Sequence, residues 1–229
     1  MATEVGKPVS EGPRQYRQFR FSLPANATEV LLVRHGETVP AVDGQPFELV
    51  DGHGDPGLAP EGRLQAERLA ARLAGERPEA IYVTNLRRTA ETAGPLAARL
   101  GLELRVEADL REVLLGEWEG GAYRRHLVEG HPLSLELIER ERWDVIPGAE
   151  SNEAFQARLR LGISRIAAAH VGRRVVAVSH GGAIGMILSM ATGSRPFAFV
   201  GADNASISRL IVSGGSWSVR GFNEVSHLT

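Results

Sequence analysis

Three short segments place an arginine or a histidine at or just beyond the end of an apolar run. They are LLVRHGET (31–38), VTNLRRT (83–89) and VSHGG (178–182). Their chemistry-bearing residues are Arg34, His35, Arg88 and His180. Two guanidinium groups and two imidazoles would repel one another if they met with nothing between them, so this set predicts an anion site. The planar donor fork of arginine matches phosphate oxygens, and the predicted ligand is therefore a phosphoryl group.

The residue types also limit which group can act as a nucleophile. The chain contains no cysteine, and no serine lies in a recognisable nucleophile motif, so a histidine is the best candidate. A neutral imidazole nitrogen can attack phosphorus in line and form a phosphohistidine that water later hydrolyses. Gly36 follows the first histidine and is expected to leave backbone room for the phosphate.

A departing alkoxide needs a proton, so the reaction also requires a general acid. Glu112, in LREVLLGEWEG, follows the third predicted strand and is expected to reach the predicted phosphate site. Four positive or potentially positive groups and one acid suit phosphoryl transfer, because that chemistry depends mostly on positioning and electrostatic stabilisation.

The segments that position these residues alternate between strand and helix patterns. Continuous apolar runs predict buried strands at 29–35, 79–84, 102–107 and in RVVAVSHGG at 174–182. Helical spacing predicts helices at 60–75, 86–101 (interrupted or kinked near Pro95), 152–170 and 182–193. SISRLIV and SWSVRGF, separated by SGG, predict a terminal hairpin.

This alternation predicts an α/β fold, a three-layer α/β/α sandwich with a mainly parallel central sheet, in a single domain over residues 1–229. In such sheets ligands bind beyond the carboxyl ends of the strands, where the three segments converge. Leu64, Leu69 and Leu73 are expected on the buried face of the first helix, and Ser151 or Asn152 is expected to cap the helix at 152–170.

Two regions lack a clear period. Residues 1–27 are expected to form an irregular arm, and residues 113–150 a cap with one short helix around Leu133–Trp143. Trp118 and Trp143 are expected to pack beneath this cap, whereas His126 and His131 are expected to face solvent. DGHGD (51–55) alternates residue types that can bind a metal, Asp51, His53 and Asp55, with glycines. Its glycine content favours a turn over a metal site.

Composition narrows the partners and the location. The formal net charge is −2 and no dense basic stripe occurs, so no nucleic-acid surface is expected. No apolar stretch is long enough for a membrane span, and the N-terminus lacks the apolar core of a secretory signal, so the expected location is the cytoplasm. The edge of the terminal hairpin is a candidate for pairing with a second copy as a homodimer.

These motifs together resemble the histidine phosphatase superfamily, in its phosphoglycerate-mutase-like branch. LLVRHGET matches the opening motif, TNLRRTAETA the second-arginine motif, LREVLLGEWEG the acid motif, GAES a helix start and VSHGG the second-histidine motif. They occur in the expected order over residues 30–182, which makes the set far more specific than any one motif.

The resemblance implies a role for each site residue. His35 would be the phosphorylated nucleophile, Arg34, Arg88 and His180 would complete the phosphate pocket, and Glu112 would protonate the leaving group. It also implies a small-molecule phosphomonoester substrate, no metal and no cofactor.

Departures from the pattern favour a phosphatase over a mutase. Mutases of the superfamily carry a Trp-Asn pair where Val39 and Pro40 follow Thr38 here, and an asparagine in the region that Gly182 and Ala183 occupy. A mutase must exclude water to retain its bisphosphate intermediate. The two alternatives are a cofactor-dependent phosphoglycerate mutase and a non-catalytic protein that binds a phospho-ligand; the second would typically have lost a core residue, and none is missing.

Overall fold

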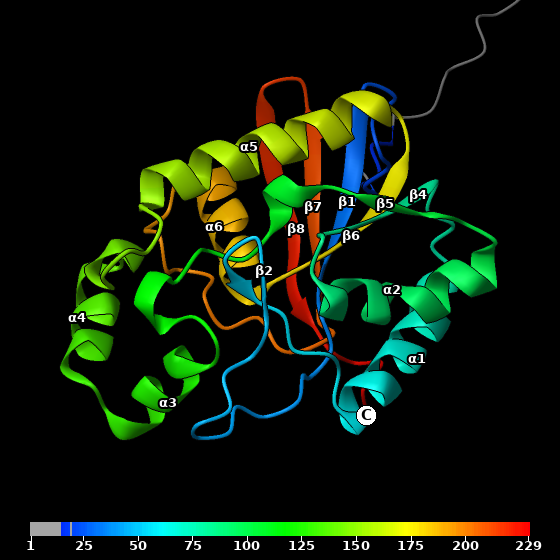
Figure 1. Cartoon of the computed structure of the whole chain (residues 1–229). Helices are drawn as coiled ribbons and strands as arrows, with labels where there is room; N and C mark the ends of the chain where they lie inside the picture. Colours follow the sequence, from blue (N-terminus) through cyan, green and yellow to red (C-terminus); the bar gives the residue numbers. More distant parts are fainter. Residues whose placement is uncertain (1–14, 19) are drawn as a thin grey trace, which may run out of the picture.

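A six-stranded sheet forms the centre of the protein, whose computed structural model describes residues 15–18 and 20–229 (Figure 1). Its order is β5-β4-β6-β1-β7-β8. The strands are β1 (Ala27–Arg34), β4 (Ala80–Val83), β5 (Leu104–Val106), β6 (Arg174–Ser179), β7 (Ile207–Ser213) and β8 (Ser216–Glu224). The first four run parallel, and β7 and β8 form the antiparallel hairpin at one edge. The predicted mainly parallel sheet is confirmed.

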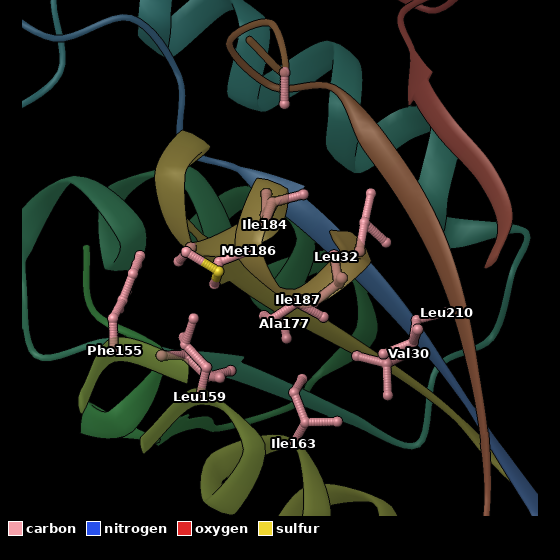
Figure 2. Packing of buried hydrophobic residues seen from close by; sticks show 14 of the residues in the cluster. Val30, Leu32, Phe155, Leu159, Ile163, Ala177, Ile184, Met186, Ile187 and Leu210 are labelled. Carbon is pink, nitrogen blue, oxygen red and sulfur yellow. The ribbon is translucent and has the colours of Figure 1, made fainter. Parts of the chain in front are cut away.

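Helices cover both faces of this sheet. Helices α1 (Pro60–Ala74) and α2 (Arg87–Leu100) lie on one face, and α5 (Asn152–Ala169) and α6 (Gly181–Thr192) on the other, while α3 (Ala122–Glu129) and α4 (Pro132–Arg140) belong to the cap. Alternate residues of a strand point to opposite faces. Leu31 and Val33 of β1 accordingly pack with α1 and α2, whereas Val30 and Leu32 pack with α5 and α6 (Figure 2). The chain is therefore the predicted three-layer α/β/α sandwich.

The helices of the sandwich begin largely as the sequence indicates. Pro60 is the first residue of α1, and the hydroxyl of Ser151 accepts a hydrogen bond from the Ala154 backbone N–H at 3.1 Å. Helix α2 runs through Pro95 to Leu100, so the expected interruption is not found. Leu64 was assigned to the wrong face, since its side chain is 55% exposed.

The cap, residues 113–150, contains two α-helices, where one was expected. Helix α4 ends at Arg140, before Trp143, because Glu141 adopts a left-handed backbone conformation with φ of 53°. Helix α3 was missed entirely. None of its eight residues is fully buried, and a helix of about two turns is too short for its apolar period to stand out in the sequence.

The chain leading into β1 has no regular structure where it is described. Residues 15–18 and 20–26 form neither helix nor strand, and the rest of the predicted arm, residues 1–14 and 19, lies outside the described residues. Within the described part of the chain, no helix has the length and apolar character needed to cross a membrane.

Candidate active site

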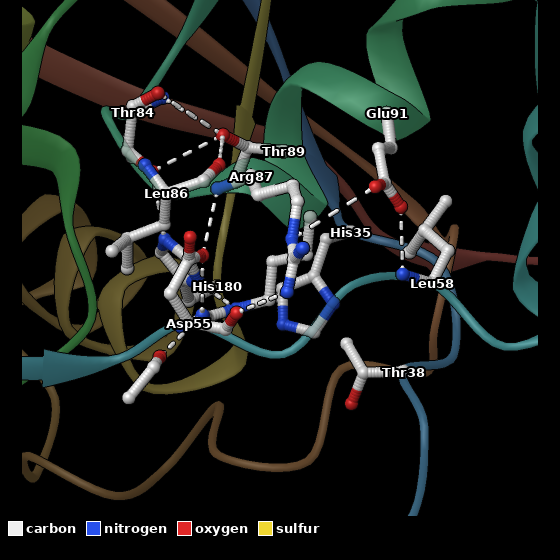
Figure 3. Close-up of polar contacts among 12 residues, drawn as sticks. His35, Thr38, Asp55, Leu58, Thr84, Leu86, Arg87, Thr89, Glu91 and His180 are labelled. Carbon is white, nitrogen blue, oxygen red and sulfur yellow. Dashed lines mark hydrogen bonds and ion pairs between the residues drawn. The ribbon is translucent and has the colours of Figure 1, made fainter. Parts of the chain in front are cut away.

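The sheet brings the predicted site residues to one edge. Arg34 is the last residue of β1 and His35 follows it, His180 follows β6, and Arg88 lies in the first turn of α2 after β4. The ring centroids of His35 and His180 are 5.2 Å apart, and Figure 3 labels the two residues beside each other. Nε of Arg88 lies 3.3 Å from Nδ1 of His180. Parallel pairing of β1 with β6 and of β6 with β4 produces this convergence.

The ring of His35 is held in one tautomer. Its Nδ1 lies 2.8 Å from the carbonyl oxygen of Gly36. A carbonyl only accepts hydrogen bonds, so Nδ1 carries the proton and Nε2 is left with a free lone pair. The His35 ring lines a cavity of about 330 Å³, and its unprotonated nitrogen is available to an electrophile there.

The ring of His180 is fixed by two partners. The guanidinium of Arg88 has no acceptor, so the 3.3 Å contact makes Nδ1 of His180 the acceptor. Nε2 then carries the proton and donates to the hydroxyl of Thr84 at 3.2 Å. His180 is therefore a neutral imidazole, and Thr84 anchors it from the end of β4.

Both histidines have a pKa well below the ordinary value of 6.5. Burial is the largest cause for each ring, and the positive charge of Arg88 is the second. Arg34 lowers the pKa of His35 further. A neutral His35 is the form that can attack phosphorus, so the burial of the ring preserves its nucleophilic state.

We expect His35 and His180 to remain neutral at about pH 6, where histidines of an unfolded chain are mostly protonated. Imidazole ¹⁵N shifts should show one protonated and one bare nitrogen in each ring, whereas the urea-unfolded chain titrates near pH 6.5. Because both folded pKa values lie below the unfolded one, stability is full above about pH 6.5 and declines as the pH falls below it. Titration of either folded ring near pH 6.5 would contradict the assignment.

Arg88→Gln provides the matched test. Removing this charge should raise the pKa of both rings, but not to 6.5, because burial contributes more than the charge.

The two arginines supply positive charge that the protein only partly compensates. Burial lowers the pKa of Arg34, and lowers that of Arg88 to about 10, against the opposing charge of Glu112. Nη1 of Arg34 donates to the carbonyl of Ala202 at 2.5 Å, and Nη1 of Arg88 to that of Gly54 at 2.8 Å. Nε of Arg34 is buried with no partner among the described residues. This unsatisfied cationic donor beside the cavity favours an anionic ligand.

Glu112 is held at the amino terminus of α6. Its two carboxylate oxygens accept hydrogen bonds from the backbone N–H groups of Gly182 and Ala183, both at 2.9 Å. A Cβ at position 182 would lie 2.5 Å from Oε1 of Glu112, so the glycine is needed for this contact. The backbone carbonyl of Glu112 accepts from Nη2 of Arg158 at 2.7 Å, which fixes the loop. Glu112 thereby lines the same cavity as His35.

Gly36 has a different role from the expected one. A Cβ at this position would lie 2.6 Å from the carbonyl oxygen of Gly62 in α1. Gly36 is not among the residues that line the cavity. The missing side chain therefore makes room for α1 and not for a phosphate.

Several residues of the cavity were not predicted as site residues. His53, Tyr123 and the two tryptophans Trp118 and Trp143 all line it. Burial and the charge of Glu112 raise the pKa of Tyr123 to about 12, so its hydroxyl stays protonated as a donor. The two tryptophans are buried, as expected. The position of Tyr123 depends on α3, a helix that the sequence pattern did not indicate.

His126 and His131 are not solvent-exposed as predicted. Both are half-buried, and their ring centroids lie 4.7 and 5.3 Å from that of Trp118. Tilted and edge-on contacts with these two rings help to hold Trp118, a residue of the cavity wall, in place.

DGHGD forms a tight connection whose three polar side chains each contact a neighbour. Asp51 and Gly52 make the turn between β2 (Leu49–Val50) and β3 (His53–Gly54). The ring of His53 lies 3.1 Å from the carbonyl oxygens of both Asp51 and Glu112, and Asp55 faces Arg88 at 3.9 Å. Across residues 15–18 and 20–229, no three histidine or carboxylate side chains are grouped to hold a metal ion.

Comparison with known proteins gives one consistent family. The model described as Histidine phosphatase superfamily (branch 1) matches residues 30–225. Phosphoglycerate mutase-like protein 4 of Arabidopsis thaliana is 35% identical over 205 residues, covering 87% of this chain and 86% of that protein. The metal-independent phosphoserine phosphatase of the same plant is 31% identical over 222 residues, covering 93% and 90%.

A solved structure has the same architecture. The mycobacterial glucosyl-3-phosphoglycerate phosphatase superposes with a TM-score of 0.71 at 28% identity, covering 87% of this chain and all of that one. The similarity therefore extends across the whole sandwich and is not limited to the site.

Proposed function

The chain belongs to the histidine phosphatase superfamily and is a phosphoric monoester hydrolase, and we propose that it works without a metal, through a phosphohistidine on His35. The observation that carries this proposal is the neutral tautomer of His35, whose free Nε2 shares a cavity with two arginines and a carboxylate. Such a site can neutralise a phosphoryl group while attacking it.

In the first proposed step, Nε2 of His35 attacks phosphorus and forms a P–N bond as the P–O bond to the alcohol breaks. Arg34 and Arg88 donate hydrogen bonds to the phosphoryl oxygens, while neutral His180, bonded to Arg88 and Thr84, completes the phosphate pocket and positions Arg88. Glu112 gives its proton to the departing oxygen, so the alcohol leaves neutral.

In the second step, Glu112 takes a proton from water as that water attacks phosphorus. The P–N bond breaks, phosphate leaves and His35 regains its lone pair. The net reaction is the hydrolysis of one phosphomonoester to an alcohol and inorganic phosphate, with Glu112 returned to its protonated state.

We propose hydrolysis in preference to phosphoryl return to a second hydroxyl. The cavity continues into a wide open cleft, through which water can reach a phosphohistidine. Val39 and Pro40 also stand where mutases carry their Trp-Asn pair. A cytoplasmic location and a small-molecule substrate belong to the same proposal.

The test is a pair of assays in excess EDTA. We expect release of inorganic phosphate from p-nitrophenyl phosphate and from a panel of metabolite phosphomonoesters, unchanged by the chelator. A coupled enolase assay should show no conversion of 3-phosphoglycerate to its 2-isomer with 2,3-bisphosphoglycerate as primer. Isomerisation faster than phosphate release would replace the proposal with a mutase, and loss of activity in EDTA would exclude the metal-independent mechanism.

A further inference from the structure

We call the cavity of about 330 Å³ that His35 lines the phosphate cavity. A second hollow of about 890 Å³ opens beside it and has more than twice its volume. We call it the outer cleft. It is lined by the loop from Glu37 to Pro46, by the segment from Glu119 to Glu129, and by Asn204. Arg34, Glu119, Gly121 and Arg124 line both hollows. A molecule whose phosphate binds at His35 therefore reaches the outer cleft directly.

The two walls of the outer cleft are fixed to each other. Arg124 of α3 donates from Nη2 to the hydroxyl of Thr38 at 2.6 Å and from Nη1 to the carbonyl of Val39 at 2.9 Å. The backbone N–H of Phe47 donates to the carbonyl of Gly120 at 3.0 Å. Figure 1 shows the blue loop that follows β1 lying beside the green α3. These hydrogen bonds hold the two walls of the cleft in fixed positions relative to each other.

The polar groups of the outer cleft suit neutral hydroxyls better than a second anion. Its outer part carries three carboxylates, from Glu37, Asp43 and Glu129. Arg125 lies between two of them, 3.8 Å from Asp43 and 3.9 Å from Glu129. In this outer part the negative charges outnumber the positive ones. A second anionic group of the substrate would therefore be repelled there. A hydroxyl donates to a carboxylate and accepts from a guanidinium or an amide, so both kinds of group can bind it.

Size points to the same class of molecule. The phosphate cavity already contains the groups that grip the phosphoryl group and protonate the leaving oxygen. The outer cleft, at about 890 Å³, lies within the usual volume range of small-molecule pockets. It therefore has room for an alcohol considerably larger than three carbons, such as a hydroxylated chain or ring of about six carbons.

We infer that the substrate is a phosphomonoester of a hydroxyl-rich alcohol, a polyol or a glycosylated alcohol, whose hydroxyls bind in the outer cleft. This inference rests on the proposed phosphatase function and adds the chemical class of the leaving group.

The first experiment compares four phosphomonoesters by kcat/KM. Sorbitol 6-phosphate and n-hexyl phosphate have the same carbon number, and only the former carries hydroxyls; glycerol 3-phosphate keeps hydroxyls on a short chain. We expect sorbitol 6-phosphate to exceed each of the other two by about tenfold, because a site built to hydrogen-bond hydroxyls rejects analogues that lack them. p-Nitrophenyl phosphate reports the phosphate cavity alone.

The second experiment fills the outer cleft. Val128 lines it and is 89% exposed, so Val128→Trp adds bulk without disturbing the core. Leu135→Trp is the matched control, since Leu135 is 66% exposed on α4 and lines neither hollow. We expect Val128→Trp to lower kcat/KM for sorbitol 6-phosphate by about fivefold or more and to leave p-nitrophenyl phosphate unchanged. Leu135→Trp should change neither.

The outcomes separate the two proposals. No hydrolysis of any of these esters refutes the phosphatase itself. Hydrolysis of p-nitrophenyl phosphate with equal rates for the three alkyl esters, or with no effect of Val128→Trp on sorbitol 6-phosphate, overturns the hydroxyl-rich substrate and leaves the phosphatase standing. Faster hydrolysis of hexyl phosphate than of sorbitol 6-phosphate would assign the cleft to apolar alcohols.

Discussion

Replacement of His35 by alanine is expected to lower turnover of p-nitrophenyl phosphate by about four orders of magnitude or more. The change removes the only bare nitrogen that the proposed first step uses, and with it the covalent intermediate. His35→Ala should also abolish phosphate labelling of the protein, which in the unchanged enzyme is lost in acid because a P–N bond is acid-labile. Rapid quenching with radiolabelled substrate measures both effects.

The fold should survive this substitution. His35 makes one side-chain hydrogen bond, to the carbonyl of Gly36, and lies beside an existing cavity, so circular dichroism and the melting temperature should be nearly unchanged. His227→Gln is the control, because His227 contacts the Ala205 carbonyl and does not line the phosphate cavity. If His35→Ala still turned over and still carried an acid-labile phosphate, another residue would be the nucleophile.

Glu112→Gln is expected to have the second largest effect, and the effect should depend on the leaving group. Alkyl phosphates release an alkoxide that needs a proton, so their rates should fall by about 10²- to 10⁴-fold. p-Nitrophenyl phosphate releases a stable phenolate, and its rate should change little. The measurement is kcat on sorbitol 6-phosphate and on p-nitrophenyl phosphate for the same preparation.

A control must separate proton donation from the hydrogen bonds that Glu112 makes. The amide of a glutamine would place a donor against the N–H groups of Gly182 or Ala183, which now donate to the carboxylate. Inhibition by inorganic phosphate reports whether the pocket keeps its shape, and Glu117→Gln alters an exposed neighbour on the same loop. Equal losses on both substrates, with phosphate inhibition intact, would remove the acid role from Glu112.

The framework that holds the site was readable from the sequence. β1 is buried along residues 27–33, so its apolar run could only be a strand covered on both faces. Because strand ends in a parallel sheet share one edge, placing His35, Arg88 and His180 together required only the order of strands and helices. Arg34 and Glu112 followed from the same reasoning and from the resemblance to a known family.

The sequence alone determined the sandwich, the edge at which the site lies and the residue types gathered there, because these depend on local periodicity and on the general geometry of α/β sheets. Only the tertiary structure decided the protonated nitrogens of His35 and His180, the anchoring of Glu112 on α6, and the outer cleft. Those features arise where segments far apart in the chain meet, as Arg88 meets His180 and Arg124 meets Thr38. Helix α3 has only eight residues, none of them fully buried, so its own sequence is too short a pattern to indicate the wall that it forms.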